Sequence, residues 1–147
     1  MNRCLVRVKK LDPAAKLPHY GTECAAGADL YACTFSDVNI APGECKVIHT
    51  GIAVELPEGC VGLIYARSGL ATKKGLAPAN KVGVIDSDYR GEVCVALYNH
   101  SSETQTVQAY DRVAQLVIAP YYLGVFEETG ELSDTIRGQG GFGSTGK

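Results

Sequence analysis

The sequence has no large excess of charge of either sign, because its 14 basic and 16 acidic side chains leave a formal net charge of only −2 over 147 residues. This balance argues against a nucleic-acid binder that relies on bulk positive charge, although a local basic pocket stays possible. No apolar run approaches the roughly 20 residues that cross a bilayer. The charges of the N-terminal segment MNRCLVRVKKLD also interrupt any apolar core of a secretory signal. We therefore expect a cytoplasmic protein, or one elsewhere inside the cell, that binds neither nucleic acid nor membrane.

Closely spaced cysteine pairs are also missing. Six cysteines are spread along the chain without a C-x-x-C pair: Cys4, Cys24, Cys33, Cys45, Cys60 and Cys94. Because no export signal is expected, this pattern does not favour the disulfide framework of a small secreted domain. We interpret the cysteines as small apolar side chains of the interior, and a metal site among them is disfavoured.

Long helical periodicity is scarce, and apolar residues instead alternate at the period of β-strands. The alternating segments lie around residues 4–9, 48–56, 61–65, 93–97 and 113–121. Turn signals at 41–44 (APGE) and 57–59 (PEG) separate such segments at short spacing. The pattern predicts an all-β sandwich or barrel.

One short helix is predicted after Arg67. Ser68 can cap its N-terminus, Lys73 and Lys74 suit its last turn, and Gly75 can supply a left-handed stop. The length allows one domain with a sizeable core, and the chain contains neither internal repeats nor an interdomain linker. We place this domain at residues 1–136.

The last eleven residues, RGQGGFGSTGK, include five glycines and should be disordered by themselves. They contain a G-x-G-x-x-G pattern and nearly a Walker A loop, but no strand and helix flank them and Ser144 replaces the required lysine. Backbone N–H groups, Ser144, Thr145 and the Arg137 guanidinium suit an anion. Phe142 has no core to join, which favours closure onto a flat ring such as a base.

Two internal segments also carry candidate chemistry. In YARSGLA (65–71) a strand delivers Arg67 and Ser68 to the start of the predicted helix, where a phosphate is favoured. An ordinary cap beside a surface arginine would give the same pattern. In NKVGVIDSDYRGE (80–92), Asp86 follows Val84 and Ile85, where partial burial would tune it as a base. A solvated turn is the alternative for Asp86.

Together these segments closely resemble the five motifs of the trimeric dUTPases. In chain order they read AGADLYA (26–32), ARSGLA (66–71), GVIDSDYRGEV (83–93), DRVAQLV (111–117) and RGQGGFGSTG (137–146). Three positions depart from the usual pattern, because Ala28 replaces an aromatic or leucine, Ala66 a proline, and Tyr110 a glycine. All three are expected to change packing or turns, and no chemical group is missing.

The resemblance implies a jelly-roll-like β-protomer, a homotrimer with active sites shared between subunits, and a flexible C-terminal arm, residues 137–147, that closes over a neighbour's site. It also implies hydrolysis of dUTP to dUMP and pyrophosphate with Mg²⁺. Water attacks the α-phosphorus, and the reaction lowers dUTP and supplies dUMP for dTMP synthesis. Two alternatives are a dCTP deaminase of the same fold and a non-catalytic dUTP-sensing module. The intact DSDY turn and the phenylalanine-bearing arm favour the dUTPase.

The motifs also imply a role for each matching residue. Asp86 resembles the catalytic aspartate that activates the water, Tyr89 the tyrosine that packs on the deoxyribose, and Asp29 a residue that meets magnesium through water. Uracil is read mainly by the backbone of a hairpin at 80–86, with Phe142 stacked upon it. The implied substrate-binding set is Arg67, Ser68, Gly69, Asn80, Gly83, Val84, Ile85, Tyr89, Gln115, Arg137, Phe142, Gly143, Ser144 and Thr145. Among them Arg67, Ser68, Gln115, Arg137, Ser144 and Thr145 match phosphate contacts.

Overall fold

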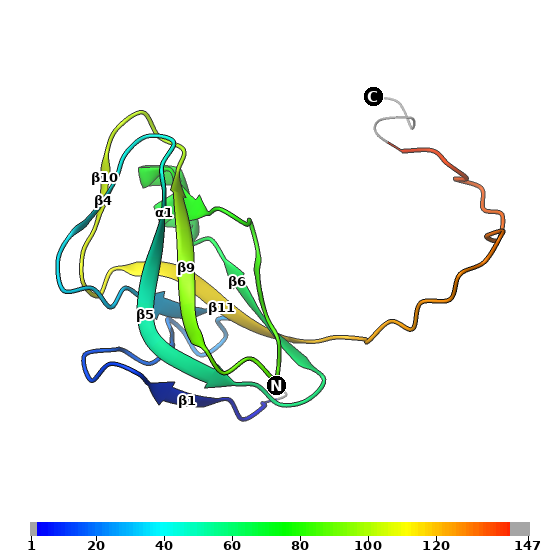
Figure 1. Ribbon diagram of the computed structural model, residues 1–147, viewed down its shortest axis with the longest axis horizontal. Coiled ribbons are helices and arrows are strands. Elements are labelled where there is room, and N and C mark those ends of the chain that lie inside the picture. The colour runs from blue at the N-terminus through cyan, green and yellow to red at the C-terminus, as the bar shows by residue number, and fades with distance from the viewer. Residues whose placement is uncertain (1–2, 142–147) are drawn as a thin grey trace.

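A computed structural model describes residues 3–141, and it is an all-β sandwich with one short helix, as the sequence predicts. Figure 1 shows β5 and β9 side by side in one layer and β6 and β11 in another. The elements are β1 (Arg7–Lys10), β2 (His19–Tyr20), β3 (Ala28–Tyr31), β4 (Val38–Ile40), β5 (Cys45–Glu55), β6 (Cys60–Tyr65), α1 (Ser68–Lys74), β7 (Leu76–Pro78), β8 (Gly83–Ile85), β9 (Glu92–Asn99), β10 (Gln105–Val107) and β11 (Arg112–Pro120). None of the helices in the described part of the chain is long and apolar enough to span a membrane.

The strands form three sheets. One sheet has the order β1-β5-β9-β7, a second has the order β2-β3-β11-β6-β8, and β10 pairs with β4 in a small third sheet. All of the paired strands described are antiparallel. Residues alternate between the core and the outer face, so that Val93, Val95 and Leu97 of β9 are buried as the periodicity predicts. In β6 the buried residues are Gly62 and Ile64, so the predicted face at 61, 63 and 65 is the outer one.

The core lies between the two large sheets. It contains side chains from almost every strand, and the largest fully buried ones are Leu30, Ile40, Ile48, Ile52, Leu76 and Leu97. One buried polar side chain connects β9 to β4 and to the loop after β9: Asn99 donates to the carbonyls of Ile40 at 2.8 Å and Glu103 at 2.7 Å, and accepts from Ser101. Because both polar atoms of this amide are hydrogen-bonded, its burial avoids the desolvation penalty that an unpaired polar group would have.

Strand β5 has an irregularity halfway along its length. Residues 45–49 pair with β9, residues 52–55 pair with β1, and Ala53 returns to β9 opposite Glu92 after a register shift. Gly51 lies at this shift with φ +68°, a left-handed conformation that costs glycine little. A Cβ at Gly51 would come within 2.9 Å of both Ala15 Cβ and Cys33 Sγ. The bend therefore needs glycine for conformation and for space.

The helix confirms two of its predicted signals and corrects the third. Gly75 ends it at φ 65°, and Lys73 and Lys74 lie in its last turn. Its N-cap, however, is Arg67, Ser68 is the first helical residue, and no side chain caps the N-terminus. Ser68 was expected at the cap because it is the nearest hydroxyl, but the chain leaves the extended conformation of β6 one residue earlier.

The six cysteines are free, as the missing C-x-x-C pairs suggested, but none is buried. Cys4, Cys24 and Cys45 are exposed, and Cys33, Cys60 and Cys94 are partly buried. The expectation of interior side chains was therefore wrong. Alternation explains the difference for two of them, because Cys45 occupies an outward position of β5 and Cys94 lies between the buried Val93 and Val95 of β9.

The packed part of the described chain ends with β11 at Pro120. Residues 121–141 form neither strand nor helix and run away from the sheets (Figure 1). Their apolar side chains are almost fully exposed, with Tyr122, Val125, Phe126 and Ile136 each at 95% or more. The boundary assigned at 136 stays a prediction, but the segment that leaves the body already begins after Pro120.

Candidate active site

Four of the five motifs lie on four neighbouring strands of one sheet. In the order β3-β11-β6-β8, these strands carry or lead into AGADLYA, DRVAQLV, ARSGLA and GVIDSDYRGEV. The central strand β11 pairs with both of its neighbours, so that Gln115 lies opposite Asp29 on one side and Tyr65 on the other. Segments far apart in the sequence are thus brought together by strand pairing.

An ion pair between motifs organises the cationic end of this sheet. The buried Asp29 carboxylate accepts from Arg67 Nε at 2.7 Å and from Arg112 Nη1 at 3.2 Å, using a different oxygen for each. A charge-assisted bond of this kind orients a guanidinium strongly. Asp29 therefore positions Arg67, and Arg112 joins the site although the motif reading did not single it out.

The Gln115 side chain completes this end. Its Nε2 donates to the carbonyl of Ala66 at 2.8 Å, beside Arg67 and Ser68. Gly27 makes room for it, because a Cβ there would overlap the Gln115 amide. A shallow pocket of about 250 Å³ lies next to the helix, and its lining includes Arg67, Gly69, Lys73, Lys74 and Arg112. Four cations around one hollow suit a polyanion.

One sequence departure has a conformational consequence beside this site. Tyr110, which replaces the usual glycine before the fourth motif, has φ +68°. Few non-glycine residues adopt this region. Its backbone N–H donates to Ala32 at 2.8 Å, and Lys16 Nζ lies 4.2 Å from its ring centroid. These contacts hold the turn that delivers Arg112 to β11.

A second pocket, also of about 250 Å³, lies at β8. Its lining contains six of the predicted residues: Asn80, Gly83, Val84, Ile85, Asp86 and Tyr89. The segment 80–86 is not the predicted hairpin, because β7 and β8 belong to different sheets and the chain crosses between the layers there. A glycine-containing apolar run looks the same in both arrangements, and only the pairing of β8 with β6 distinguishes them.

Among the described residues 3–141, strand β8 is the edge of its sheet and pairs only with β6. An edge strand has backbone N–H and C=O groups on its free side. Residues 83–85 line the pocket, so backbone groups on the free side of β8 can pair with a ring whose edge alternates acceptor, donor and acceptor.

Asp86 and Tyr89 follow directly after β8, and both are exposed in the single chain. Partial burial of Asp86 was expected and is not found within one chain. Tyr89 packs against the backbone of Gly91, where a Cβ would approach the ring carbon Cζ at 2.6 Å, and its hydroxyl donates to the Glu92 carbonyl at 3.0 Å. The tyrosine ring is therefore held in one place, although its outer face is free.

Glu92 and Cys94 also line the β8 pocket, and the motif reading missed their side chains. Desolvation acts to raise the Glu92 pKa, but hydrogen bonds from His49 and from the Gly51 backbone, with the His49 charge, lower the pKa below its ordinary value. For Cys94, burial and then the nearby Glu92 charge raise the thiol pKa to about 11. No local pattern in the sequence could have found them, because only the pairing of β5 with β9 places Cys94 opposite His49.

The two pockets lie toward opposite ends of strand β6. Ile85 pairs with Gly62, so Asp86 follows β8 toward the start of β6, whereas Arg67 follows the end of β6. Gly62 and Arg67 are five residues apart, which corresponds to about 17 Å of extended chain. One chain therefore presents two half-sites that face different regions of its surface.

The fifth motif begins in the extended C-terminal segment. Arg137 lies in that segment, and its Nε donates to the Gly140 carbonyl at 2.8 Å, so it contacts neither half-site in this chain. Phe142, Gly143, Ser144 and Thr145 lie outside the described residues, and their assigned roles stay predictions.

The position of the Asp29 carboxylate suits contact with magnesium through water and not direct coordination. Both carboxylate oxygens already hold arginines, so direct coordination would break an ion pair. Contact through water leaves both pairs intact, and magnesium beside phosphates commonly keeps several waters. The residue fits the predicted water-mediated contact.

The fold and the two half-sites together are those of a β-sandwich protein whose surface suits a small phosphorylated ligand. A family model described as dUTPase matches residues 14–146, and the chain belongs to the dUTPase family. Deoxyuridine 5′-triphosphate nucleotidohydrolases of Desulfitobacterium hafniense and Nautilia profundicola are each 51% identical to it, covering 99% and 97% of this chain and 99% of each relative.

Solved structures give the same result. A mutant dUTPase of Staphylococcus bacteriophage 80alpha with dUpNHpp superposes with a TM-score of 0.85 at 29% identity, over 97% of this chain and 99% of that one. A mutant dUTPase from S. aureus phage phi11, described with a structural Mg(II) ion, superposes with a TM-score of 0.80 at 26% identity, over 89% and 100%.

Proposed function

We propose that this enzyme hydrolyses dUTP to dUMP and pyrophosphate through the two half-sites described above. The observation that carries the proposal is the pairing of a base-sized pocket on the edge strand β8 with a cluster of four cations beside α1. The first suits uracil and the second a triphosphate. Its substrate is an intracellular nucleotide, so a cytoplasmic location is part of the proposal.

Each half-site has a distinct task. Backbone groups of residues 83–85 and the Asn80 amide bind the uracil edge, and Tyr89 packs on the deoxyribose where a 2′-hydroxyl would not fit. Arg67, Ser68, Gly69 and Gln115 bind phosphate oxygens. These assignments are supported by the free edge of β8 and by the bonds that orient Arg67 and Gln115.

Asp86 is the proposed general base. Its carboxylate accepts a proton from a water molecule that attacks the α-phosphorus, and the bond from that phosphorus to the bridging oxygen breaks. Pyrophosphate leaves, and dUMP remains. Arg67 and Arg112 neutralise charge on the triphosphate in the transition state. Magnesium, when bound near Asp29 through water, adds Lewis-acid neutralisation of the phosphate oxygens.

A homotrimer with shared sites is the proposed assembly. Two observations support it: the half-sites of one chain lie toward opposite ends of β6, and the segment after Pro120 exposes large apolar side chains. An exposed apolar strip of this kind marks a surface that another chain covers. In the assembled enzyme, Asp86 of one subunit would complete the cation cluster of another. Arg137, Phe142, Gly143, Ser144 and Thr145 would close over the site from a C-terminal arm.

Pyrophosphate release from dUTP, UTP and the four common dNTPs tests the substrate. We expect rapid release from dUTP and very slow release from UTP. Ammonia release from dCTP would instead identify the deaminase, and tight dUTP binding without turnover would identify a sensing module. Tyr89→Ala should narrow the dUTP-to-UTP ratio of kcat/KM, and an unchanged ratio would remove Tyr89 as the sugar filter.

A further inference from the structure

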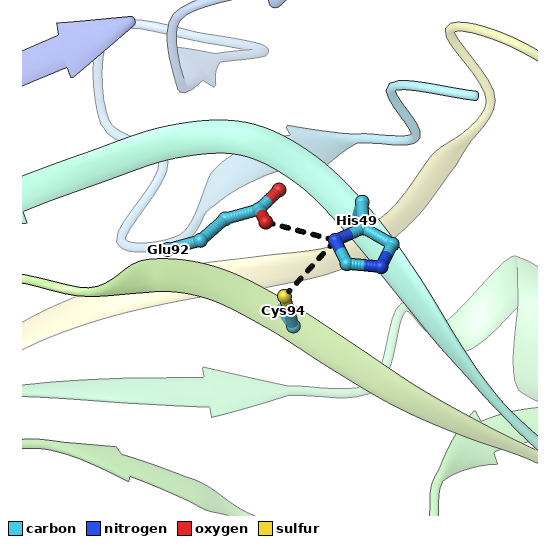
Figure 2. Close-up of side chains that lie close together, drawn as sticks. All are labelled: His49, Glu92 and Cys94. Carbon is cyan, nitrogen blue, oxygen red and sulfur yellow. Dashed lines mark hydrogen bonds and ion pairs between the residues drawn. The ribbon is translucent and has the colours of Figure 1, made fainter. Parts of the chain in front are cut away.

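Three potential metal ligands from two strands meet on the outer face of the β5–β9 sheet (Figure 2). His49 of β5 lies directly opposite Cys94 of β9 in the strand register, and Glu92 is two residues earlier on the same face of β9. Their ligand atoms all lie within 4.8 Å of one another. The proposed hydrolysis assigns no chemical step to this cluster.

A single nitrogen is the centre of the cluster. His49 Nδ1 lies 2.8 Å from Glu92 Oε2 and 3.6 Å from Cys94 Sγ. The Glu92 carboxylate also accepts a hydrogen bond from the Cys94 thiol, so each of the three side chains contacts the other two. A cation among the three would use all of them.

The two distances from His49 Nδ1 are close to those of a tetrahedral transition-metal site. Metal–ligand distances of 2.0–2.3 Å for nitrogen, oxygen and sulfur place neighbouring ligands about 3.3–3.6 Å apart. The nitrogen–sulfur distance already has this value, and the nitrogen–oxygen distance of 2.8 Å needs an opening of about 0.5 Å. A small pivot of the partly exposed Glu92 carboxylate about Oε1, the oxygen bonded to Gly51, is enough for this opening.

The surroundings hold the ligands in place. The Gly51 backbone N–H donates to the other Glu92 oxygen, Oε1, at 2.8 Å, so the β5 bend orients the carboxylate. Such outer contacts strengthen and orient metal ligands. A hollow lined by Cys33, Thr34, Phe35, His49, Gly51 and Glu92 opens beside the cluster and gives solvent a route to it.

We propose that His49, Glu92 and Cys94 form a binding site for Zn²⁺ or a chemically similar divalent transition ion, distinct from the magnesium used with the triphosphate. The three side chains are the ligands, and the Cys94 thiol releases its proton to solvent when sulfur binds the metal. The fourth position is open to water. Imidazole and thiolate select zinc-like ions, whereas Mg²⁺ prefers oxygen ligands.

Cobalt titration of the full-length, nucleotide-free protein tests the site. We expect one Co²⁺ per chain, a near-ultraviolet thiolate-to-cobalt charge-transfer band, and loss of that band when Zn²⁺ is added. A large excess of Mg²⁺ should leave the band unchanged. A wild-type protein with no thiolate–cobalt band would overturn the proposal.

Single variants separate this site from adventitious binding to other cysteines. Cys94→Ser and His49→Ala should each weaken Zn²⁺ binding at least about tenfold, measured by competition with a chromophoric chelator. Cys45→Ser is the matched control, because Cys45 lies on the same outer face of β5, four residues from His49, and is exposed. It should bind like the wild type. Both test residues are partly or fully exposed, and Cys94→Ala provides a second variant if serine disturbs the fold. Equal losses in Cys45→Ser, or full binding in both Cys94→Ser and His49→Ala, would refute the assignment.

Discussion

At the scale of single residues, hydrogen-bond partners decide which role a side chain can take. Asp29 is buried and bonded to two arginines, so its charge orients Arg67. Asp86, by contrast, is exposed and its side chain has no hydrogen-bond partner among the described residues, although both aspartates belong to motifs of the same site. An unpaired carboxylate next to a pocket is available to accept a proton, whereas one held by two guanidiniums is not. The structure thus separates a positioning aspartate from a candidate base.

Replacement of the candidate base should remove turnover and spare binding. In Asp86→Asn the shape is kept but the proton acceptor is lost, so kcat should fall by about 10²–10⁴-fold. Binding of a non-hydrolysable dUTP analogue, measured by calorimetry, should change little. Asp88→Asn is the matched control, because Asp88 is an exposed carboxylate in the same turn. Equal losses of kcat in the two variants would show that the turn, and not the Asp86 carboxylate, was disturbed.

At the level of elements, pairing decides what each segment does. Strands β7 and β8 are neighbours in the chain and lie in different sheets, so the connection at 79–82 carries Asn80 across to the pocket at β8. Strand β5 bends at Gly51, where its register with β9 shifts, and the Gly51 backbone N–H there holds the Glu92 carboxylate. Irregular positions in the strands therefore direct side chains toward both sites.

Two glycines distinguish strain from crowding at such a bend. Gly51 and Gly59 both have positive φ, +68° and +76°, but a Cβ at Gly51 would meet three neighbours and one at Gly59 would meet none within 4 Å. Gly59→Ala should cost about 1 kcal/mol of unfolding free energy through backbone strain alone. Gly51→Ala should cost about 2–4 kcal/mol, because overpacking is added. Urea denaturation measures both, and equal costs would contradict a crowded bend.

For the whole molecule, the central question is how a site forms from halves that lie far apart. The C-terminal segment has too little apolar surface in contact with its own body to be ordered by it, and contacts with other subunits and ligand would have to stabilise it. In the proposed assembly, catalysis is coupled to subunit association, because each chain would depend on its neighbours for a complete site.

Removal of residues 137–147 should therefore lower kcat severely and leave assembly and thermal stability nearly unchanged. Phe142→Ala should be milder, with a loss of about 1–3 kcal/mol of substrate binding from base stacking. Light scattering and thermal denaturation measure the first two properties, and steady-state kinetics the third.

Subunit mixing tests whether the arm and the base come from different chains. Neither the truncated protein nor full-length Asp86→Asn should be active by itself, but exchanged mixtures should recover part of the activity. Mass spectrometry verifies the exchange. Verified mixtures without recovery would mean that the arm serves its own subunit or takes no part in catalysis, and an active monomer in solution would contradict shared sites.

The sequence by itself determined the fold class, the helix stop and the motif residues. The alternation of apolar residues, Gly75 and each of the motifs from AGADLYA to DRVAQLV can be recognised within a short stretch of the chain. Tertiary structure decided the rest. It assigned Ser68 to the helix and Arg67 to its cap, turned the expected 80–86 hairpin into a crossing between sheets, exposed Asp86, and moved the cysteines out of the core. These outcomes depend on the way the strands pair and pack. The partners, such as β6 and β8 or His49 and Cys94, are too far apart in the sequence for local periodicity to specify their pairing.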